Sequence, residues 1–348
     1  MPERNLSEVE CARLITEIES GAAVDPSRIT LSDFLDRFER DWVALHTTPA
    51  SAHRYKLSLD YARQHLGGRR LQDIEPADLA KLYGTLSRTL AARTVRHCHT
   101  VLHNALEHAK VWKLLRDNPA DLVKPPPIPE TETQIPQPDQ IRDLLDRLQG
   151  HPLRMLAQLA VSTGARRNEL LALRWSDLDL AAGTMRIVQA FEQANGVVRI
   201  KAPKTRAGKR VITLPPAMAT ELRRHWAEQQ EQRLSLGLGR SPADGFVLCD
   251  VAGCHLTPDT VSGQWARAMD AIGMPDTTLH SLRHFHASSL IAAGMDILTI
   301  SRRLGHASPS ITLGVYGHMI TGTDAQAAAI MDRTLNGSKA VAKTVKEP

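Results

Sequence analysis

Apolar side chains recur with helical spacing through most of the first third of the chain. They fall on one helical face between residues 31 and 42, and again between residues 95 and 109. The pair Gly67-Gly68 interrupts the pattern between these stretches. A shorter amphipathic run, roughly Ser7 to Glu19, also has helical spacing. We therefore expect an N-terminal helix within 1–27 and an all-helical domain over 28–123.

Prolines dominate the segment that follows, residues 124–138. Because proline lacks the backbone N–H that a helix interior needs, it favours an extended spacer. The pattern predicts a linker at 124–138, a second domain at 139–335, and a flexible tail at 336–348.

The hydrophobic period changes inside the second domain. Residues 184–190, 197–201 and 210–214 alternate apolar and polar side chains, which predicts a three-stranded antiparallel sheet. Helical patterns precede it at about 138–148, 153–162 and 167–174, and resume from 216 to about 335. The expected fold is mainly α with a small antiparallel β-sheet: a helical domain followed by an α+β domain.

Composition narrows the class of protein. The chain has 348 residues, 42% of them apolar, which suits two packed domains. We find no apolar run of membrane-spanning length and no secretory signal, so we expect no membrane partner. Four scattered cysteines indicate free thiols in a cytoplasmic setting: Cys11, Cys98, Cys249 and Cys254.

Charge adds a modest indication of the partner. The net charge is +5, of which residues 28–124 carry about +5 by our count of Lys and Arg against Asp and Glu. This is consistent with binding a polyanion. Aromatic residues make up only 4% of the chain, so stacking on unpaired bases is a poorer explanation than binding to a duplex.

Two arginines are candidates for binding a phosphodiester. A guanidinium fork matches the oxygens of a phosphate under attack and stays protonated, so Arg166 and Arg283 would form a clamp. A surface salt bridge is the ordinary role of a single arginine, and Arg167 and Arg174 fit that role. Arg166 instead follows Thr-Gly-Ala at a predicted helix start. We expect Glu169, one turn on, to orient the arginine side chains.

Two histidines and a tyrosine complete the candidate chemistry. His280 lies three residues before Arg283, on the same helical face. His306 follows Gly305, which breaks the helix, and a neutral imidazole there can donate to a phosphate oxygen. Tyr316 is the candidate nucleophile. A phenol with a pKa of about 10 needs a proton acceptor and a positive field, which His280 and the arginines would supply. The alternative is a core tyrosine on an amphipathic helix.

A lysine would protonate the leaving oxygen. Lys204 lies in Pro-Lys-Thr, on the turn between two predicted strands, with Lys201 and Lys209 as competitors. A metal site is the less favoured alternative for the remaining histidines, because no Asp, Glu or Cys completes a ligand spacing around them: His284, His286 and His318. Cys249 and Cys254 also lack a second ligand pair.

The motifs in this order resemble those of the tyrosine recombinase (phage integrase) family: Thr-Gly-Ala-Arg-Arg-Asn-Glu-Leu at 163–170, His-Ser-Leu-Arg at 280–283, Leu-Gly-His at 304–306, and Tyr316. Ser281 departs from a frequent aspartate, and Gly314 from a bulkier or acidic residue. The Pro-Lys-Thr context of Lys204 resembles the family's β-hairpin lysine. The resemblance runs from about residue 29 to 335, and the chain starts at a helix similar only to the end of the family's arm-binding domain.

The resemblance implies a fold and a reaction. Residues 28–123 would be a helical core-binding (SAM-like) domain, and 139–335 the catalytic domain. Tyr316 would attack the scissile phosphate to give a 3′-phosphotyrosyl bond and a free 5′ hydroxyl. A 5′ hydroxyl from a second duplex would then attack that bond, so neither a metal nor another cofactor is implied.

Partners also follow from the resemblance. It implies a homotetramer on two sites in double-stranded DNA, with DNA-bending or excision factors as possible accessories. The helix at about 325–335 would pack in trans on a neighbour or dock on its own core. Candidates for DNA contacts are Arg54, Lys56, Arg93 and Arg96, for each of which a solvated surface charge is the alternative.

The favoured function is site-specific integration or excision of a phage or other mobile element. Three alternatives stay open: Xer-type resolution of DNA multimers, a DNA-binding member without catalysis, and a type IB topoisomerase. The last shares the chemistry but would relax supercoils without exchanging strands.

Overall fold

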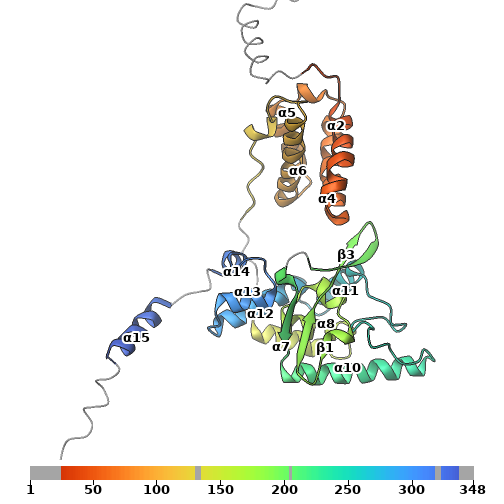
Figure 1. Cartoon of the computed structure of the whole chain (residues 1–348), viewed down its shortest axis with the longest axis vertical. Helices are drawn as coiled ribbons and strands as arrows, with labels where there is room; N and C mark the ends of the chain where they lie inside the picture. Colours follow the sequence, from red (N-terminus) through yellow and green to blue (C-terminus); the bar gives the residue numbers. More distant parts are fainter. Residues whose placement is uncertain (1–24, 130–134, 204–205, 318–322, 337–348) are drawn as a thin grey trace, which may run out of the picture. The chain divides into compact units, whose positions relative to one another are not determined.

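The computed structural model describes residues 25–129, 135–203, 206–317 and 323–336. The chain divides into two compact units, Met1–Glu132 and Thr133–Pro348, and the division falls within the proline-rich stretch (Figure 1). The finer boundaries expected from the sequence, at 27, 123, 138 and 335, stay predictions. The helix expected near Ser7 and the tail from 337 onward lie outside the described residues.

The N-terminal unit is helical where it is described. Four longer helices form it, joined by short helical turns: α2 (Leu31–Phe38), a π-helical turn (Glu39–Val43), α3 (Ala44–His46), α4 (Pro49–Leu66), a 3₁₀ turn (Leu71–Asp73), α5 (Pro76–Leu86), α6 (Ala92–Val111) and a second 3₁₀ turn (Pro119–Leu122).

Local sequence explains how α2 begins and what it buries. Thr30 accepts a hydrogen bond from the backbone N–H of Asp33, and the Asp33 carboxylate accepts one from that of Thr30, a reciprocal cap. The apolar positions of the helix, including Phe34 and Phe38, are fully buried against α4 and α6. Burying side chains of this size contributes roughly 1.5–3 kcal/mol each, so packing rather than helix propensity holds the unit together.

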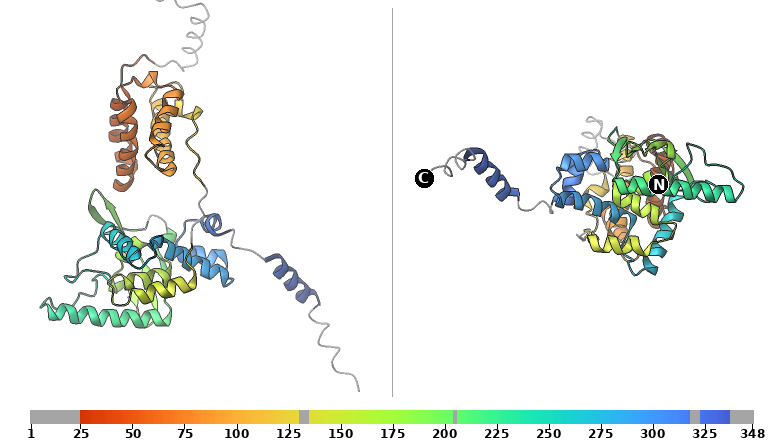
Figure 2. Two further views of the ribbon diagram at one scale, coloured as in Figure 1. Left: turned by 180° about the vertical axis from the view of Figure 1, so that it is seen from behind. Right: turned by 90° about the horizontal axis from the view of Figure 1, so that it is seen from below.

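The C-terminal unit combines helices with two small sheets. Its elements in chain order are α7 (Pro138–Arg147), α8 (Arg154–Thr163), α9 (Arg167–Leu171), a 3₁₀ turn (Trp175–Asp177), β1 (Leu178–Asp179), β2 (Thr184–Ile187), β3 (Ala190–Ala194), β4 (Val197–Lys201), a 3₁₀ turn (Arg206–Gly208), β5 (Arg210–Thr213), α10 (Pro216–Ser235), α11 (Pro258–Ala271), α12 (Leu279–Ala292), α13 (Ile297–Leu304), α14 (Pro309–Tyr316) and α15 (Thr323–Asn336). In Figures 1 and 2, α10 runs along one side of this unit and the β3–β4 hairpin projects from the opposite side.

The fold is mainly α with small antiparallel sheets, as expected, but the strands pair differently from the prediction. The three-stranded sheet has the order β1-β2-β5, and Val197–Lys201 lies instead in a separate hairpin with Ala190–Ala194. The cause is local. Asn195 and Gly196 both have positive φ, 51° and 75°, which is the two-residue turn that joins adjacent antiparallel strands.

Two glycines allow the central elements to approach one another. Gly164 ends α8 and Gly305 ends α13, both in the left-handed region with φ near +65°, at 63° and 68°. A Cβ at Gly164 would lie 2.6 Å from the His286 ring, and one at Gly305 would lie 2.7 Å from the Arg210 guanidinium. These two turns therefore need glycine for both backbone and space.

Candidate active site

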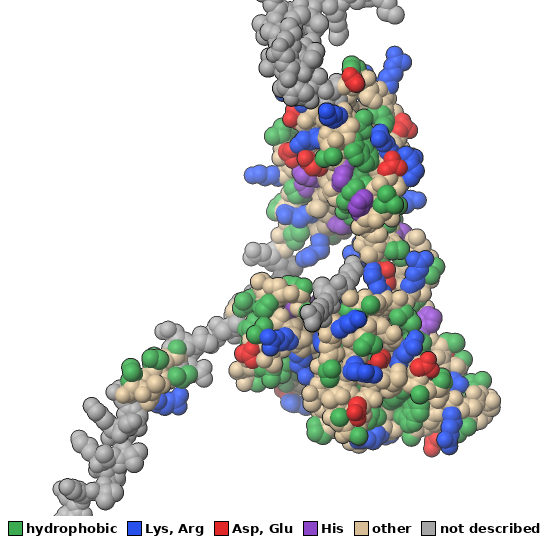
Figure 3. Space-filling model, viewed as in Figure 1, with side chains coloured by type: hydrophobic (Ala, Val, Ile, Leu, Met, Phe, Trp, Pro, Cys, Tyr) green, Lys and Arg blue, Asp and Glu red, His purple; other side chains and the backbone are tan. Residues whose placement is uncertain are grey.

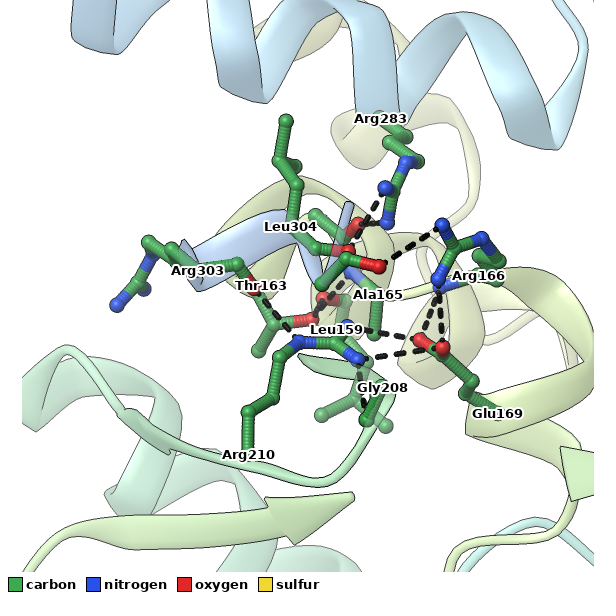
Figure 4. Close-up of polar contacts among 12 residues, drawn as sticks. Leu159, Thr163, Ala165, Arg166, Glu169, Gly208, Arg210, Arg283, Arg303 and Leu304 are labelled. Atoms are coloured by element: carbon green, nitrogen blue, oxygen red, sulfur yellow. Dashed lines mark hydrogen bonds and ion pairs between the residues drawn. The ribbon is translucent and has the colours of Figure 1, made fainter. Parts of the chain in front are cut away.

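The C-terminal end of α13 is the centre of the candidate site. The last carbonyls of a helix have no intrahelical partner and carry the negative end of its dipole. Here three arginines bind three successive carbonyls: Arg210 Nε donates to Arg303 O (2.7 Å), Arg283 Nη2 to Leu304 O (2.8 Å) and Arg166 Nη2 to Gly305 O (3.2 Å) (Figure 4). The helix end gathers guanidinium groups from distant parts of the sequence, and the carbonyl of Gly305 lies 139 positions from the Arg166 that binds it.

Arg166 is positioned from its own helix start. It is the N-cap residue of α9, and its backbone N–H donates to Glu169 Oε2 at 2.9 Å. Its Nη1 donates to Glu169 Oε1, also at 2.9 Å. The side chain is nevertheless 43% exposed, so its guanidinium is fixed by Glu169 and still open to a ligand. The expected orienting role of Glu169 is consistent with this geometry.

Arg283 is more deeply buried than Arg166. The residue is 3% exposed, and its Nη1 donates to Gly164 O at 2.6 Å, in addition to the bond to Leu304. Burial, and then the charge of Arg166, lower the pKa of Arg283 to about 9. That value still leaves the guanidinium cationic at neutral pH. In Figure 4, the side chains of Arg283 and Arg166 both point toward the carbonyl groups at the end of α13.

Arg210 is a site residue that the sequence analysis missed. Its side chain is 6% exposed and forms a two-point ion pair with Glu169, Nη2 to Oε2 at 2.8 Å and Nη1 to Oε1 at 3.2 Å. Burial alone would raise the pKa of Glu169, but its hydrogen bonds and ion pairs with Arg210 and Arg166 outweigh burial and hold the pKa below its usual range. A single carboxylate thus fixes two arginines.

His306 and His280 approach the arginines from different elements. His306 Nδ1 lies 2.8 Å from the Thr312 hydroxyl. Burial, and then the charges of Arg283 and Arg166, lower its pKa to about 4, so the ring is neutral at pH 7. If Nδ1 accepts from Thr312, Nε2 carries the proton and can donate to an anion. Partial burial, followed by the charges of Arg283 and Arg166, also lowers the pKa of His280, which leaves that ring able to accept a proton.

Tyr316 lies at the end of α14 and is almost fully buried, with 2% exposed. Its ring belongs to a small apolar cluster with Ala287, Ile300 and Leu304. The hydroxyl lies 2.7 Å from Nδ1 of His284, a residue given no catalytic role in the sequence analysis. Burial raises the pKa of Tyr316 to about 12, so the phenol is protonated at neutral pH.

The structure describes only some of the candidate lysines and candidate metal-binding histidines. Lys204 and His318 lie outside the described residues. Of the competitors, Lys201 pairs with Glu192 at 3.0 Å, and Lys209 is exposed. His286 uses both ring nitrogens within the protein, Nδ1 with Val161 O (2.8 Å) and Nε2 as acceptor from Arg303 Nε (3.0 Å).

The helical unit carries the candidate DNA contacts on its surface. Arg54 and Lys56 lie on α4, and Arg93 and Arg96 on α6, all exposed. The Arg96 side chain donates to Pro126 O at 3.2 Å, whereas the side chains of the other three make no hydrogen bond or ion pair within the described residues. Figure 3 shows Lys and Arg side chains spread over one face of this unit.

In the part of the chain that the structure describes, no helix is long and apolar enough to cross a membrane.

Comparison with known proteins gives the family model and the fold. The model of the phage integrase family matches residues 136–321. A relative from Caldanaerobacter subterraneus subsp. tengcongensis, described as "Tyrosine recombinase XerC-like", is 25% identical over 334 residues, covering 90% of this chain and 85% of that protein.

Two solved structures share the fold. The Tn1549 transposon integrase in complex with transposon right end DNA has a TM-score of 0.72 at 20% identity, covering 87% of this chain and 99% of that one. A lambda integrase tetramer bound to a Holliday junction has a TM-score of 0.61 at 19% identity, and the match covers 89% of this chain and 84% of that one.

Proposed function

The chain belongs to the phage integrase family and is a site-specific DNA recombinase, and on that premise we propose that Arg166 and Arg283 clamp a scissile phosphate that Tyr316 attacks. The observation that carries this assignment is the convergence of Arg166, Arg283 and the His306 turn at the end of α13. Two cations fixed before the substrate arrives stabilise the extra negative charge of the five-coordinate phosphorus without reorganising.

The steps balance without an outside energy source. The Tyr316 oxygen bonds to phosphorus as the bond to the 5′ oxygen breaks, and the phenolic proton passes to His280. Lys204 supplies the proton that the leaving 5′ oxygen takes up, and His306 donates a hydrogen bond to a non-bridging oxygen. A 5′ hydroxyl of a second duplex then attacks the phosphotyrosyl bond, and the phenol recovers its proton. No cofactor enters these steps.

The DNA is held mainly through its phosphates. Arg54, Lys56 and Arg93 are exposed cations with no partner within the described residues, which suits contact with the DNA backbone, and Arg96 lies on the same helix as Arg93. By analogy with the lambda integrase tetramer on a Holliday junction, we propose that four copies act on two sites. DNA-bending or excision factors would set the direction of the reaction in the cytoplasm of the host.

Covalent capture tests the proposal. Wild type, Tyr316→Phe and Tyr61→Phe would be expressed in cells and purified under denaturing conditions, and attached DNA would be sequenced. Tyr61 lies on α4 in the other unit, so its variant controls for loss of a phenol as such. We expect DNA ending at one phosphate position in wild type and Tyr61→Phe, and none in Tyr316→Phe.

The other outcomes separate the alternatives. Attachment at random positions would indicate a topoisomerase. Attachment at a site repeated on host chromosomes or plasmids, rather than at the ends of a mobile element, would indicate resolution of multimers. Absence of attached DNA in wild type, even with a nicked substrate that prevents religation, would indicate a member that binds DNA without catalysis. Attached DNA in Tyr316→Phe would contradict Tyr316 as the nucleophile.

A further inference from the structure

The hydroxyl of Thr312 has an unusual partner for a threonine inside a helix. In several other helices of this chain the threonine hydroxyl donates to the backbone carbonyl four residues earlier, at 2.6 to 3.2 Å: Thr85, Thr100, Thr163 and Thr220. Within the described residues Thr312 makes no such bond, although it is 0% exposed. Its hydroxyl lies instead 2.8 Å from Nδ1 of His306, which precedes α14.

The direction of this hydrogen bond follows from what each partner needs. Within the described residues the Thr312 hydroxyl has no other partner, so its proton points to His306 Nδ1 or stays buried without an acceptor. A buried donor without an acceptor loses its hydration and gains nothing in return. His306 can accept, because burial and then the charges of Arg283 and Arg166 lower its pKa to about 4 and keep the ring neutral at pH 7. Thr312 is therefore the donor.

That direction determines the tautomer of His306. A neutral imidazole carries one proton, so when Nδ1 accepts a hydrogen bond the proton lies on Nε2. Within the described residues Nε2 makes no hydrogen bond, and the His306 side chain is only partly buried, so this N–H is available to a ligand. The charges of Arg166 and Arg283 act on the same ring, which places the N–H beside the proposed phosphate clamp.

Helix α14 does not need the Thr312 hydroxyl for its own start. Its N-cap is Ser308, whose hydroxyl accepts from the Ser310 backbone N–H at 3.2 Å. Thr312 and Tyr316 lie four residues apart on one face and are the buried residues of the helix. The hydroxyl that orients His306 and the proposed nucleophile therefore belong to the same face of one element.

We propose that Thr312 is a positioning residue for His306: its hydroxyl holds the imidazole in the tautomer whose Nε2–H donates to a non-bridging oxygen of the scissile phosphate. The inference rests on the proposed role of His306 as that donor. A ring with its proton on Nδ1 would instead present a lone pair to the phosphate, and a histidine held in the wrong tautomer loses its function even when the geometry is intact. The hydroxyl also fixes the ring before the phosphate binds, so no reorganisation is needed during the reaction.

Nitrogen NMR of the full chain with ¹⁵N-labelled histidine tests the tautomer before any reaction. Protonated and unprotonated ring nitrogens have well-separated shifts, and His306→Gln identifies the His306 signals among those of the 15 histidines. At neutral pH we expect the proton on Nε2 and a hydrogen-bonded Nδ1. Thr312→Val keeps the shape of the side chain and should move the Nδ1 signal toward that of a free imidazole, whereas Thr312→Ser should keep it in place.

Cleavage rates on a nicked duplex of the captured sequence provide the second readout. Thr312→Val should form the covalent complex about 10- to 100-fold more slowly, the range known for the partners that orient metal-bound histidines, and Thr312→Ser should restore most of the rate. In a His306→Gln background Thr312→Val should cause no further loss, because the hydroxyl acts through the ring. Thr220→Val, which removes an exposed hydroxyl on α10, is the matched control.

Three results would overturn the proposal: a proton on Nδ1 of His306 in wild type, an Nδ1 signal that Thr312→Val leaves unchanged, or an equal loss of rate from Thr312→Val with and without His306. The first result needs no substitution at Thr312, so the test holds even if Thr312→Val does not fold. Failure of the proposed function looks different. His306→Gln would then cleave as fast as wild type, whatever the tautomer of His306.

Discussion

At the scale of single residues, the Glu169 carboxylate forms ion pairs with both Arg166 and Arg210, so its charge should contribute to the free energy of unfolding. The carboxylate and Arg210 are 5% and 6% exposed. Because Glu169→Gln leaves the Arg210 guanidinium buried with no counter-charge, we expect a loss of roughly 3–5 kcal/mol in the free energy of unfolding. Urea unfolding of the C-terminal unit, followed through fluorinated Trp175, Trp226 and Trp265, would measure it.

Glu221→Gln is the matched control. Glu221 pairs with Arg224 on α10, where the two side chains are 32% and 51% exposed. Surface pairs of this kind contribute about 0–1 kcal/mol, so the control should unfold nearly as wild type does. Equal losses in the two variants would show that Glu169 does not act as the shared anchor of two arginines.

Arg283 should resist replacement by the other basic residue. Its fork donates to Gly164 O and Leu304 O at once, which an ammonium group cannot reproduce in the same plane. We expect Arg283→Lys to slow formation of the phosphotyrosyl complex on the order of 100-fold or more, comparable to losing a preorganised donor at a reacting oxyanion. Quench-flow on a nicked duplex would measure the rate, with Arg224→Lys as a surface control.

The sequence could point to most of this site, but not to all of it. Arg166, His280, Arg283, His306 and Tyr316 lie in short motifs whose residue types indicate phosphate chemistry. Arg210 lies outside them. The sequence signal for Arg210 is the alternation of side chains along β5. Arg210 lies on the same strand face as the buried Ile212, while Val211 between them is 63% exposed. An arginine on the apolar face of a strand indicates a buried ion pair.

At the scale of elements, helix ends and turns determine which side chains meet. The carbonyls at the end of α13 gather Arg166, Arg210 and Arg283, and this could not be inferred from periodicity, which carries no information about contacts between distant segments. The strand pairing was predictable in part. Asn195-Gly196 is a strong signal for a two-residue hairpin turn. That signal pairs residues 190–194 with 197–201, whereas the alternating pattern alone placed 197–201 in the larger sheet.

Helix α12 and the turn after α13 carry histidines that make stability depend on pH. Burial lowers the pKa of His284, His286 and His306 to about 4, against 6.5 for an unperturbed histidine. Between these values the unfolded chain binds protons that the folded chain does not. The free energy of unfolding should therefore fall as pH drops from about 6.5 to about 4, with a slope approaching 1.4 kcal/mol per pH unit, roughly, for each histidine.

Urea unfolding at a series of pH values checks this dependence. His286→Phe should reduce the slope over that window, whereas His65→Gln, on the exposed face of α4, should leave it unchanged. A stability that stays constant from pH 6.5 to 4 would mean that the three rings are not held in the neutral form by the fold.

At the scale of the whole molecule, the proposed DNA contacts lie in the helical unit and the proposed catalytic residues lie in the C-terminal unit. If Arg54, Lys56 and Arg93 contact DNA phosphates, each releases about one counterion on binding. We expect replacing any one of them with Gln to weaken binding to all DNA sequences alike and to reduce the slope of log affinity against log salt by about 1. Fluorescence anisotropy over a salt series would measure both.

Arg40 is the control in the same unit, because its guanidinium already pairs with Asp41 at 2.7 Å. Arg40→Gln should leave the salt slope as it is. The rate of phosphotyrosyl formation at saturating DNA should also be unchanged in the Arg54, Lys56 and Arg93 variants, since the clamp and the nucleophile lie in the other unit. A variant that lost cleavage at saturation while keeping its salt slope would show that the helical unit acts on the chemistry itself, and that binding and cleavage are coupled between the units.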